Sequence, residues 1–87
     1  MITSRQLRAA RALAGLDQAA LAKAARLSLP TIQRMEASDG LIRGNVESLM
    51  KLFTALERAG IELINEGAAS ETGGRGVRLK TPSRRMR

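Results

Sequence analysis

The stretch that decides the fold is residues 17–36, which read DQAALAKAARLSLPTIQRME. Asp17 and Ser28 are both good N-cap residues, so the pattern predicts one short helix over 18–25 and a second that begins after Ser28. Pro30 falls in the first turn of the second helix, where its missing N–H is tolerated. Two helices held at a steep angle by so short a turn form a helix-turn-helix, whose second helix can enter the major groove of DNA.

The apolar residues of this stretch are placed to lock the two helices together. Ala22 is small at the point where the second helix must cross the first closely, and Leu27 fills the turn. Ile32 and Met35 lie three residues apart on the second helix and form its predicted buried pair. The other positions of the second helix are therefore expected to point outward.

Capping signals predict one further helix on each side of this pair. Thr3 followed by Gln6 has the spacing of a capping box and predicts a helix over 4–14. Asn45 caps a fourth helix, which Gly60 ends. Apolar residues recur along this helix with helical spacing, so we expect its inward positions to be Val46, Leu49, Met50, Phe53 and Leu56. The chain is thus expected to be mostly α, with four helices.

Beyond position 60 the pattern changes from helical to extended. Residues 61–65 alternate partially and residues 77–80 alternate strictly, so each stretch predicts a short strand. These strands form either a C-terminal β-hairpin or a pair that joins two copies of the chain. We divide the chain into a helix-turn-helix DNA-binding domain over 1–60, a strand segment over 61–80 with a flexible loop at 66–76, and a disordered basic tail at 81–87.

The composition argues against enzymatic and metal chemistry. The 87 residues include neither Cys nor His. The commonest general base, the commonest metal ligand and the thiolate nucleophile are therefore missing, and no disulfide can form. We expect no catalytic residue, no metal site and no cofactor. No apolar run approaches the roughly 18 residues of a membrane span, so we expect a cytoplasmic protein.

Charge is segregated along the chain, whose formal net charge is +7. Residues 1–34 carry six basic and one acidic side chain, residues 35–74 carry three basic and seven acidic ones, and residues 75–87 carry six basic ones and no acid. Such segregation indicates one face for a polyanion and a separate region for another contact. The alternative is that the arginines only keep an Ala-rich chain soluble.

Residues from about 5 to 58 resemble the lambda-repressor/Cro-type helix-turn-helix domain, the xenobiotic-response-element family of bacterial and phage regulators. The phrases that carry the resemblance are LRAAR at 7–11, LDQAALA at 16–22 and PTIQRME at 30–36. The family often has Gly in the turn, where this chain has Arg26. A side chain at positive φ costs on the order of 1 kcal/mol, so the turn is expected to be either slightly strained or differently shaped. The predicted strand at 61–65 also stands where the family usually has a fifth helix.

The resemblance implies a DNA-binding surface made of Gln18, Ser28, Leu29, Pro30, Thr31, Gln33, Arg34 and Arg43. Gln18 and Arg43 would contact phosphates. Arg34 suits guanine, Gln33 suits adenine, and Leu29 suits a thymine methyl group. The alternatives are that Gln18 only caps its helix and that Leu29 and Pro30 only shape the start of the second helix. For Arg34 the alternative is that it faces solvent or pairs with the surroundings of Glu36.

The resemblance also implies a structural ion pair between Arg11 and Glu36. This pair would belong to the scaffold and would not contact DNA. By contrast, Arg5 and Arg8 are expected on a solvated face.

We expect a homodimer formed through the C-terminal strands. Two short strands make only a marginal hairpin, and a free strand edge invites pairing with another chain. The residues assigned to this interface are Ile61, Leu63, Val77 and Leu79. The alternative is that the strands only cover the fourth helix in a monomer.

These observations favour a sequence-specific regulator of transcription that binds double-stranded DNA. We expect a repressor that binds an inverted-repeat operator as a homodimer and is associated with the nucleoid. One alternative is the antitoxin of a toxin–antitoxin pair, which would use the same DNA-binding half and bind a toxin through the segment after position 60. A less favoured alternative is an RNA-associated adaptor that uses the basic tail.

Overall fold

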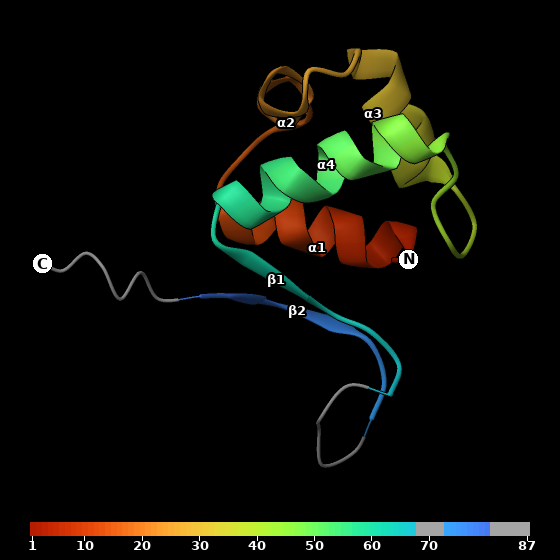
Figure 1. The fold of residues 1–87 in the computed structure, drawn as a ribbon, viewed down its shortest axis with the longest axis vertical. Coiled ribbons are helices and arrows are strands. Elements are labelled where there is room, and N and C mark those ends of the chain that lie inside the picture. Colours follow the sequence, from red (N-terminus) through yellow and green to blue (C-terminus); the bar gives the residue numbers. More distant parts are fainter. Residues whose placement is uncertain (68–72, 81–87) are drawn as a thin grey trace, which may run out of the picture.

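The computed structural model of the chain describes residues 1–67 and 73–80. Four helices come first, and an antiparallel hairpin of two strands follows them (Figure 1). In chain order the elements are α1 (Ser4–Ala14), α2 (Gln18–Ala25), α3 (Leu29–Ala37), α4 (Val46–Arg58), β1 (Ile61–Ile64) and β2 (Gly76–Leu79). The predicted fold class is confirmed. Residues 68–72 of the loop predicted at 66–76, and the whole tail predicted at 81–87, lie outside the two described ranges.

Each helix begins after the cap residue that the sequence predicts. The side chains of Thr3, Asp17, Ser28 and Asn45 each accept a hydrogen bond from the backbone N–H three residues further along. Thr3 belongs to a complete capping box, because Gln6 Oε1 accepts from the Thr3 N–H at 2.9 Å. Such caps satisfy N–H groups that the helix itself leaves unpaired, and each stabilises the fold by about 1 kcal/mol.

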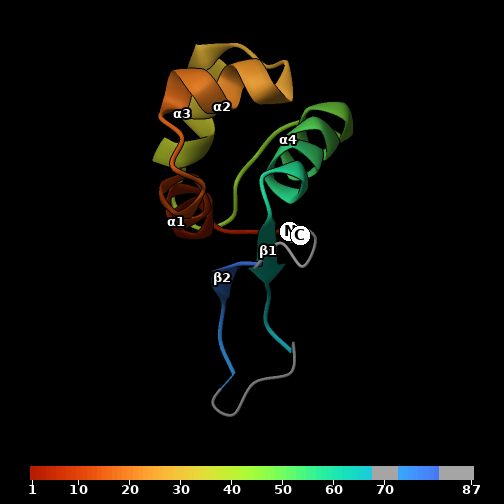
Figure 2. The same ribbon diagram turned by 90° about the vertical axis from the view of Figure 1, so that its left-hand side faces the viewer.

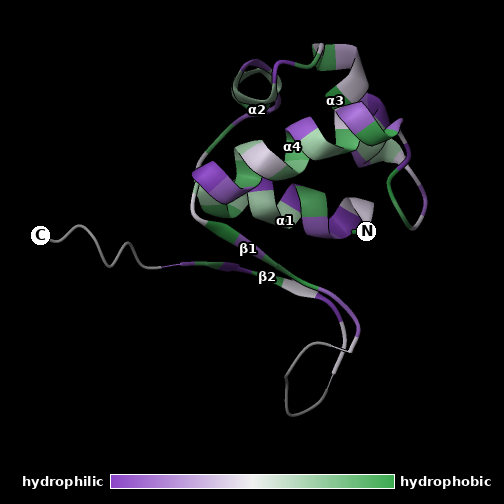
Figure 3. Cartoon of the chain, in the orientation of Figure 1, coloured by the Kyte–Doolittle hydropathy of each residue, from purple (hydrophilic) through white to green (hydrophobic). Residues whose placement is uncertain are grey.

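One apolar core lies between the four helices and extends to β1. Its largest fully buried side chains are Ile2, Leu7, Leu21, Ile32, Met35, Leu52 and Leu56. Hydrophobic and hydrophilic residues both occur along each helix (Figure 3), and the buried apolar ones recur three to four positions apart, as in amphipathic helices. Helices this short are marginal in water, and burying one such side chain contributes about 1.5–3 kcal/mol. Tertiary packing is therefore what stabilises them.

The inward face of α4 differs from the one that its sequence pattern predicts, because Leu52 and Ala55, which the prediction left out, are buried. Leu49, Leu52 and Leu56 are buried, whereas Val46 and Met50 are 76% and 57% exposed. The expectation that these last two residues point inward is wrong. Helix α4 packs against α1, α2 and β1, and residues 46 and 50 lie on its flank, outside that contact.

The turn between α2 and α3 keeps a positive φ at the position where the family often has Gly. Arg26 has φ 57° and ψ 40°, and it is the only non-Gly residue with positive φ in the described ranges. The N–H of Leu27 donates to the carbonyl of Ala22 at 2.9 Å, which closes the end of α2. Arg26 thus adopts a conformation that glycine would adopt without strain.

The two strands pair with each other within the chain. Ile61 lies opposite Leu79, and Leu63 lies opposite Val77. The hairpin extends from the helices on the side away from α2 and α3 (Figure 2). Strand β1 is one residue shorter than predicted, and β2 begins and ends one residue earlier. Ile61 is 3% exposed and belongs to the core, whereas Leu79 is 49% exposed.

A buried glutamine fastens the hairpin to α1. Gln6 is 4% exposed, and its Nε2 donates to the carbonyls of Ile64 at 2.9 Å and Gly76 at 3.1 Å. Its Oε1 accepts from Arg75 Nη1 at 3.3 Å, and that guanidinium also donates to the Met1 carbonyl at 2.8 Å. One amide therefore both completes the α1 cap and joins two strand ends.

Candidate nucleic-acid interface

Helix α3 presents one face to the core and the other to solvent. Ile32, Met35 and Glu36 are buried. The residues that the resemblance assigns to DNA contact occupy the other side, where Ser28, Leu29, Pro30, Gln33 and Arg34 are exposed and Thr31 is half-buried. Because α2 and the buried pair hold α3 from behind, this outward face is available to a partner as large as a DNA duplex.

A row of polar side chains runs along this outward face. Ser28 Oγ lies 2.8 Å from Thr31 Oγ1, and it also accepts from the Thr31 N–H at 3.2 Å. Arg34 Nη2 in turn donates to Thr31 Oγ1 at 3.4 Å. The three residues are spaced at i, i+3 and i+6, so they follow one side of the helix. Thr31 thereby restricts the directions in which the Arg34 guanidinium can point.

Arg34 and Arg43 come together from two different elements. Together with Ala37 and Ser38 they line a hollow of about 430 Å³, to which α3 and the loop before α4 both contribute. Within the described ranges neither guanidinium forms an ion pair with a carboxylate. Two cations that form no ion pair there favour a phosphate or the acceptor edge of a guanine.

The carboxylate of Glu36 joins three helices beneath this surface. It is 5% exposed, and it accepts from Arg11 Nε at 2.7 Å and from Arg11 Nη2 at 3.1 Å. Arg11 Nη1 also donates to the carbonyl of Leu16 at 3.2 Å. The ion pair that the resemblance implies is therefore present as a two-pronged contact. The hydrogen bond to Glu36 is the main cause that raises the pKa of Arg11 above its ordinary value.

Gln18 is held by the same carboxylate. Its Nε2 donates to Glu36 Oε1 at 3.0 Å, so in this structure the amide lies against the scaffold. A phosphate contact by Gln18 remains a prediction, and the amide would have to exchange this partner or share it. The N-terminal backbone N–H groups of α2 and its helix dipole favour an anion at the same place. Nothing in the spacing of Gln18 from Glu36 indicates this hydrogen bond.

Arg8 has a contact that sequence reasoning missed. Its Nη1 donates to the backbone carbonyl of Glu36, in the last turn of α3, where a cation is favourable because of the helix dipole. Arg8 is exposed, as expected, but its guanidinium also makes this contact with α3. Its position three residues before Arg11 puts both guanidinium groups on one side of α1, which is the one signal that could have indicated the contact.

Comparison with known proteins agrees with this geometry. The family model described as "Helix-turn-helix domain" matches residues 4–62. No curated protein matches the chain. In the part of the chain that the structure describes, no helix combines the length and the apolar character needed to cross a membrane. The match extends over more than half of the chain and spans all four helices and the start of β1. The chain therefore belongs to the helix-turn-helix domain family, a class of DNA-binding modules.

Proposed function

We propose that the protein is a transcriptional regulator that binds a specific double-stranded DNA sequence, and that it represses transcription as a homodimer on an inverted-repeat operator in the nucleoid. The observation that carries this proposal is the outward face of α3. Arg34 is exposed there beside Arg43, while Ile32 and Met35 anchor the opposite face in the core. A rigidly held helix with unpaired cations suits the major groove.

Different residues of the surface have different tasks in this proposal. Arg34 reads guanine through its O6 and N7 atoms, Gln33 reads adenine, and Leu29 packs on a thymine methyl group. Arg43 binds a phosphate beside the groove, and Gln18 at the start of α2 binds another. The base contacts select the sequence, and the phosphate contacts set the position of the protein along the duplex. Ser28, Pro30 and Thr31 shape and orient the exposed end of α3.

The outer edge of β2 is the proposed contact between two copies. The N–H of Lys80 donates to the Gly60 carbonyl at 2.7 Å. Because hydrogen-bonded residues alternate along an antiparallel strand, the N–H and C=O groups of Leu79 and Val77 point away from β1. An open edge of this kind can pair with the same edge of a second chain around a two-fold axis. Such a dimer would present two recognition helices about 34 Å apart, one turn of DNA.

The four residues assigned to this interface differ in how directly they would contact the second copy. Leu79 is exposed and lies on the contact edge. Leu63 and Val77 are half-buried and pack against the core from the hairpin. Ile61 is buried beneath them. It therefore supports the hairpin and is not expected to touch the second copy.

Selection of bound fragments from a random pool of duplex DNA tests the proposed function. A regulator should enrich one sequence with two-fold symmetry, and fluorescence anisotropy should then show tighter binding to that sequence than to scrambled duplex. The variant Arg34→Ala should reduce this preference, and Lys23→Ala, which removes one charge from the exposed side of α2, should preserve it. Equal affinity for all duplexes, or a preference for structured RNA, would contradict the proposal.

A further inference from the structure

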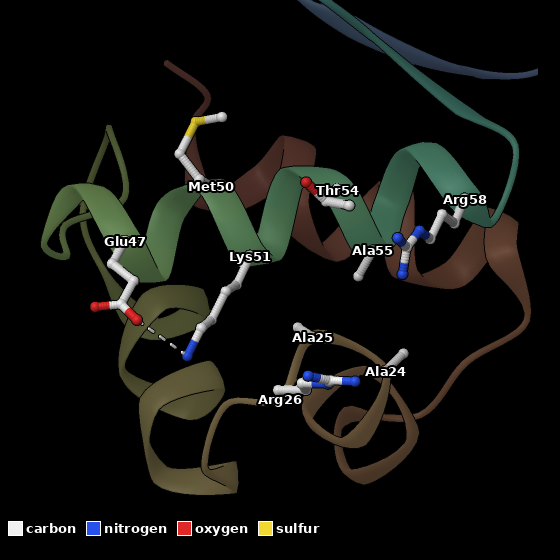
Figure 4. A pocket seen from close by; sticks show the side chains of 9 residues that line it. All are labelled: Ala24, Ala25, Arg26, Glu47, Met50, Lys51, Thr54, Ala55 and Arg58. Atoms are coloured by element: carbon white, nitrogen blue, oxygen red, sulfur yellow. Dashed lines mark ion pairs between the residues drawn. The ribbon is translucent and has the colours of Figure 1, made fainter.

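A groove between α2 and α4 lies apart from the proposed DNA-contacting residues. Its volume is about 410 Å³, which falls within the range of small-molecule sites. The residues that line it are Ala24, Ala25, Arg26, Glu47, Met50, Lys51, Thr54, Ala55 and Arg58 (Figure 4). None of these residues belongs to the surface formed by α3 and Arg43. The groove is therefore a second feature that recognition of DNA bases does not explain.

The groove combines cationic walls with an apolar base. Arg26 reaches it from the end of α2, and Lys51 and Arg58 reach it from α4 (Figure 4). The one acidic lining residue is Glu47, whose Oε2 lies 3.4 Å from Lys51 Nζ. In the described part of the chain, the guanidinium groups of Arg26 and Arg58 form no hydrogen bond or ion pair with another side chain.

Small apolar residues form the base of the groove. Ala24 is exposed there, whereas Ala25 and Ala55 are 3% and 7% exposed and belong to the core, and Thr54 adds an exposed hydroxyl on α4 (Figure 4). A site of this kind gains free energy from apolar contact and orients its ligand through a few charges. A ligand that fits it has a compact apolar body and one anionic group.

The conformation of Arg26 adds an independent observation. Its positive φ of 57° is strained for any side chain, and Gly would relieve that strain. A strained residue that persists at a defined place is reason to look for a role of its side chain. Here the side chain contributes a guanidinium to the groove, which Gly cannot do.

We propose that the groove between α2 and α4 binds a small organic anion, with its carboxylate or phosphate group held by Arg26 and Arg58 and its apolar body against the exposed methyl group of Ala24. Arginine suits such a group because its planar donors match the oxygens of carboxylate and phosphate in pairs. Lys51 contributes a further positive charge, which Glu47 partly neutralises. This inference is separate from base recognition and concerns a site on the other side of α2.

Binding at this site would change the affinity for DNA. Arg26 is the corner residue between α2 and α3, so a ligand held by its guanidinium adds negative charge beside the helix pair that carries α3. The positive potential that attracts phosphates falls, and DNA binding weakens. This consequence rests on the proposed function, whereas the binding of the anion does not.

Titration of the full-length ¹⁵N-labelled chain, followed by amide chemical shifts, tests the site directly. The probes are hexanoate, which has an apolar body and a carboxylate, and inorganic phosphate, which lacks the apolar body. Sodium chloride keeps the ionic strength constant. Hexanoate should cause saturable shifts at the amides of 24–26 and 51–58, with tighter binding than phosphate. Shifts that do not saturate, or that spread over all basic regions equally, would overturn the proposal.

Two variants and one matched control locate the binding. Arg58→Gln and Arg26→Gly should each raise the Kd for hexanoate about tenfold, because each removes a charge-assisted contact. Lys23→Gln removes the same charge from α2 outside the groove and should leave the Kd unchanged. Arg26→Gly should also raise Tm, so weaker binding by this variant cannot be attributed to loss of the fold. An equal loss of affinity in Lys23→Gln would show that only the net charge matters.

Two further outcomes identify a different occupant. If a ten-residue poly-glutamate peptide binds the groove more tightly than hexanoate does, the occupant is an acidic protein segment and the small-ligand proposal is wrong. If Arg58→Gln flattens the salt dependence of DNA binding without affecting hexanoate, the groove is a phosphate contact of the duplex. Specific DNA binding with no hexanoate site would overturn this inference alone, and a hexanoate site without specific DNA binding would overturn only the proposed function.

Discussion

Arg11 Nε in α1 lies 2.7 Å from Glu36 Oε2 in α3, and the Glu36 side chain is 5% exposed. Helix α3 is therefore joined to α1 by an ion pair whose carboxylate is buried and whose guanidinium is 23% exposed. Gln18 Nε2 also donates to this carboxylate at 3.0 Å, so the start of α2 is joined to the same point. Buried charges need such partners, because a carboxylate left alone in the interior costs several kcal/mol.

Replacing the acid should therefore lower stability. Glu36→Ala should reduce the free energy of unfolding by about 2–4 kcal/mol, since Arg11 and Gln18 lose their acceptor. Urea denaturation measures this change, and Asp39→Ala, at an exposed acid, should have little effect. An effect of Glu36→Ala no larger than that of the control would contradict a structural role for the pair.

The contribution of the Arg11–Glu36 pair to the free energy of unfolding should not change between pH 6 and pH 9. The pKa of Arg11 is raised, chiefly by its hydrogen bond to Glu36. A group whose folded pKa lies above its unfolded pKa stabilises the fold fully below the unfolded pKa and loses that effect as pH rises through the folded pKa. For arginine this window lies in strongly alkaline solution. Unfolding curves at pH 6 and pH 9 should therefore show the same Glu36→Ala difference.

Glycine in the turn should stabilise the protein. Arg26→Gly removes a side chain from positive φ and should raise the free energy of unfolding by about 0.5–1 kcal/mol, because the strain relieved exceeds the extra entropy that Gly loses on folding. Lys23→Gly, in the interior of α2, should instead lower it by about 1 kcal/mol. Urea denaturation of the two variants side by side gives the comparison, and a stability loss in both would be inconsistent with the observed turn.

The attachment of the hairpin should depend on Gln6. Gln6→Leu leaves the carbonyls of Ile64 and Gly76 without the amide donor that now reaches both, at a cost of about 1–3 kcal/mol. Hydrogen exchange at the backbone amides of β1 and β2 should accelerate more than exchange in α4. Gln33→Leu, at an exposed glutamine of α3, should leave hydrogen exchange in the hairpin unchanged. If this control also accelerated exchange in β1 and β2, the effect of Gln6→Leu could not be assigned to the lost hydrogen bonds.

Two arginines of the candidate interface should separate base reading from phosphate binding. Arg34→Ala should cost about 1–3 kcal/mol on the selected operator and relax the preference at one base pair. Arg43→Ala should weaken operator and scrambled duplex alike and flatten the plot of log K against log salt by about 0.9. Anisotropy titrations over a series of salt concentrations distinguish these patterns. If Arg43→Ala relaxed the base preference and Arg34→Ala only flattened the salt dependence, α3 would lie on the DNA in a different register.

The dimer contact should be sensitive to a charge on the open edge of β2. Leu79→Glu places an acid at a 49% exposed position of that edge, where its symmetry mate would repel it, and should convert the dimer to a monomer in analytical sedimentation. Val46→Glu changes a 76% exposed residue on α4 and should leave the dimer intact. A wild-type monomer at tens of micromolar, or dissociation caused only by Val46→Glu, would remove the edge-pairing proposal.

The sequence by itself determined where the helices begin and at which residue the turn between α2 and α3 would be strained if it kept the family's shape. Thr3 and Asp17 act within three residues of their own position, and the positive φ of Arg26 is a demand of the turn itself. Such local features can be predicted from the sequence because caps and backbone angles are set by neighbouring residues. The buried pair Ile32 and Met35 could be predicted for the same reason, from its spacing within one helix.

Only the tertiary structure decided which of several compatible partners each side chain meets. Helical periodicity placed Met50 among the inward positions, but the side of α4 that packs on its neighbours leaves it exposed. Gln6 was recognisable as a capping residue, yet its second contact joins it to Gly76, 70 residues away. Gln18 in α2 likewise donates to the Glu36 carboxylate in α3, and Arg8 in α1 donates to the Glu36 backbone carbonyl. Such contacts depend on how whole helices and strands are oriented, and no local preference of the chain encodes that orientation.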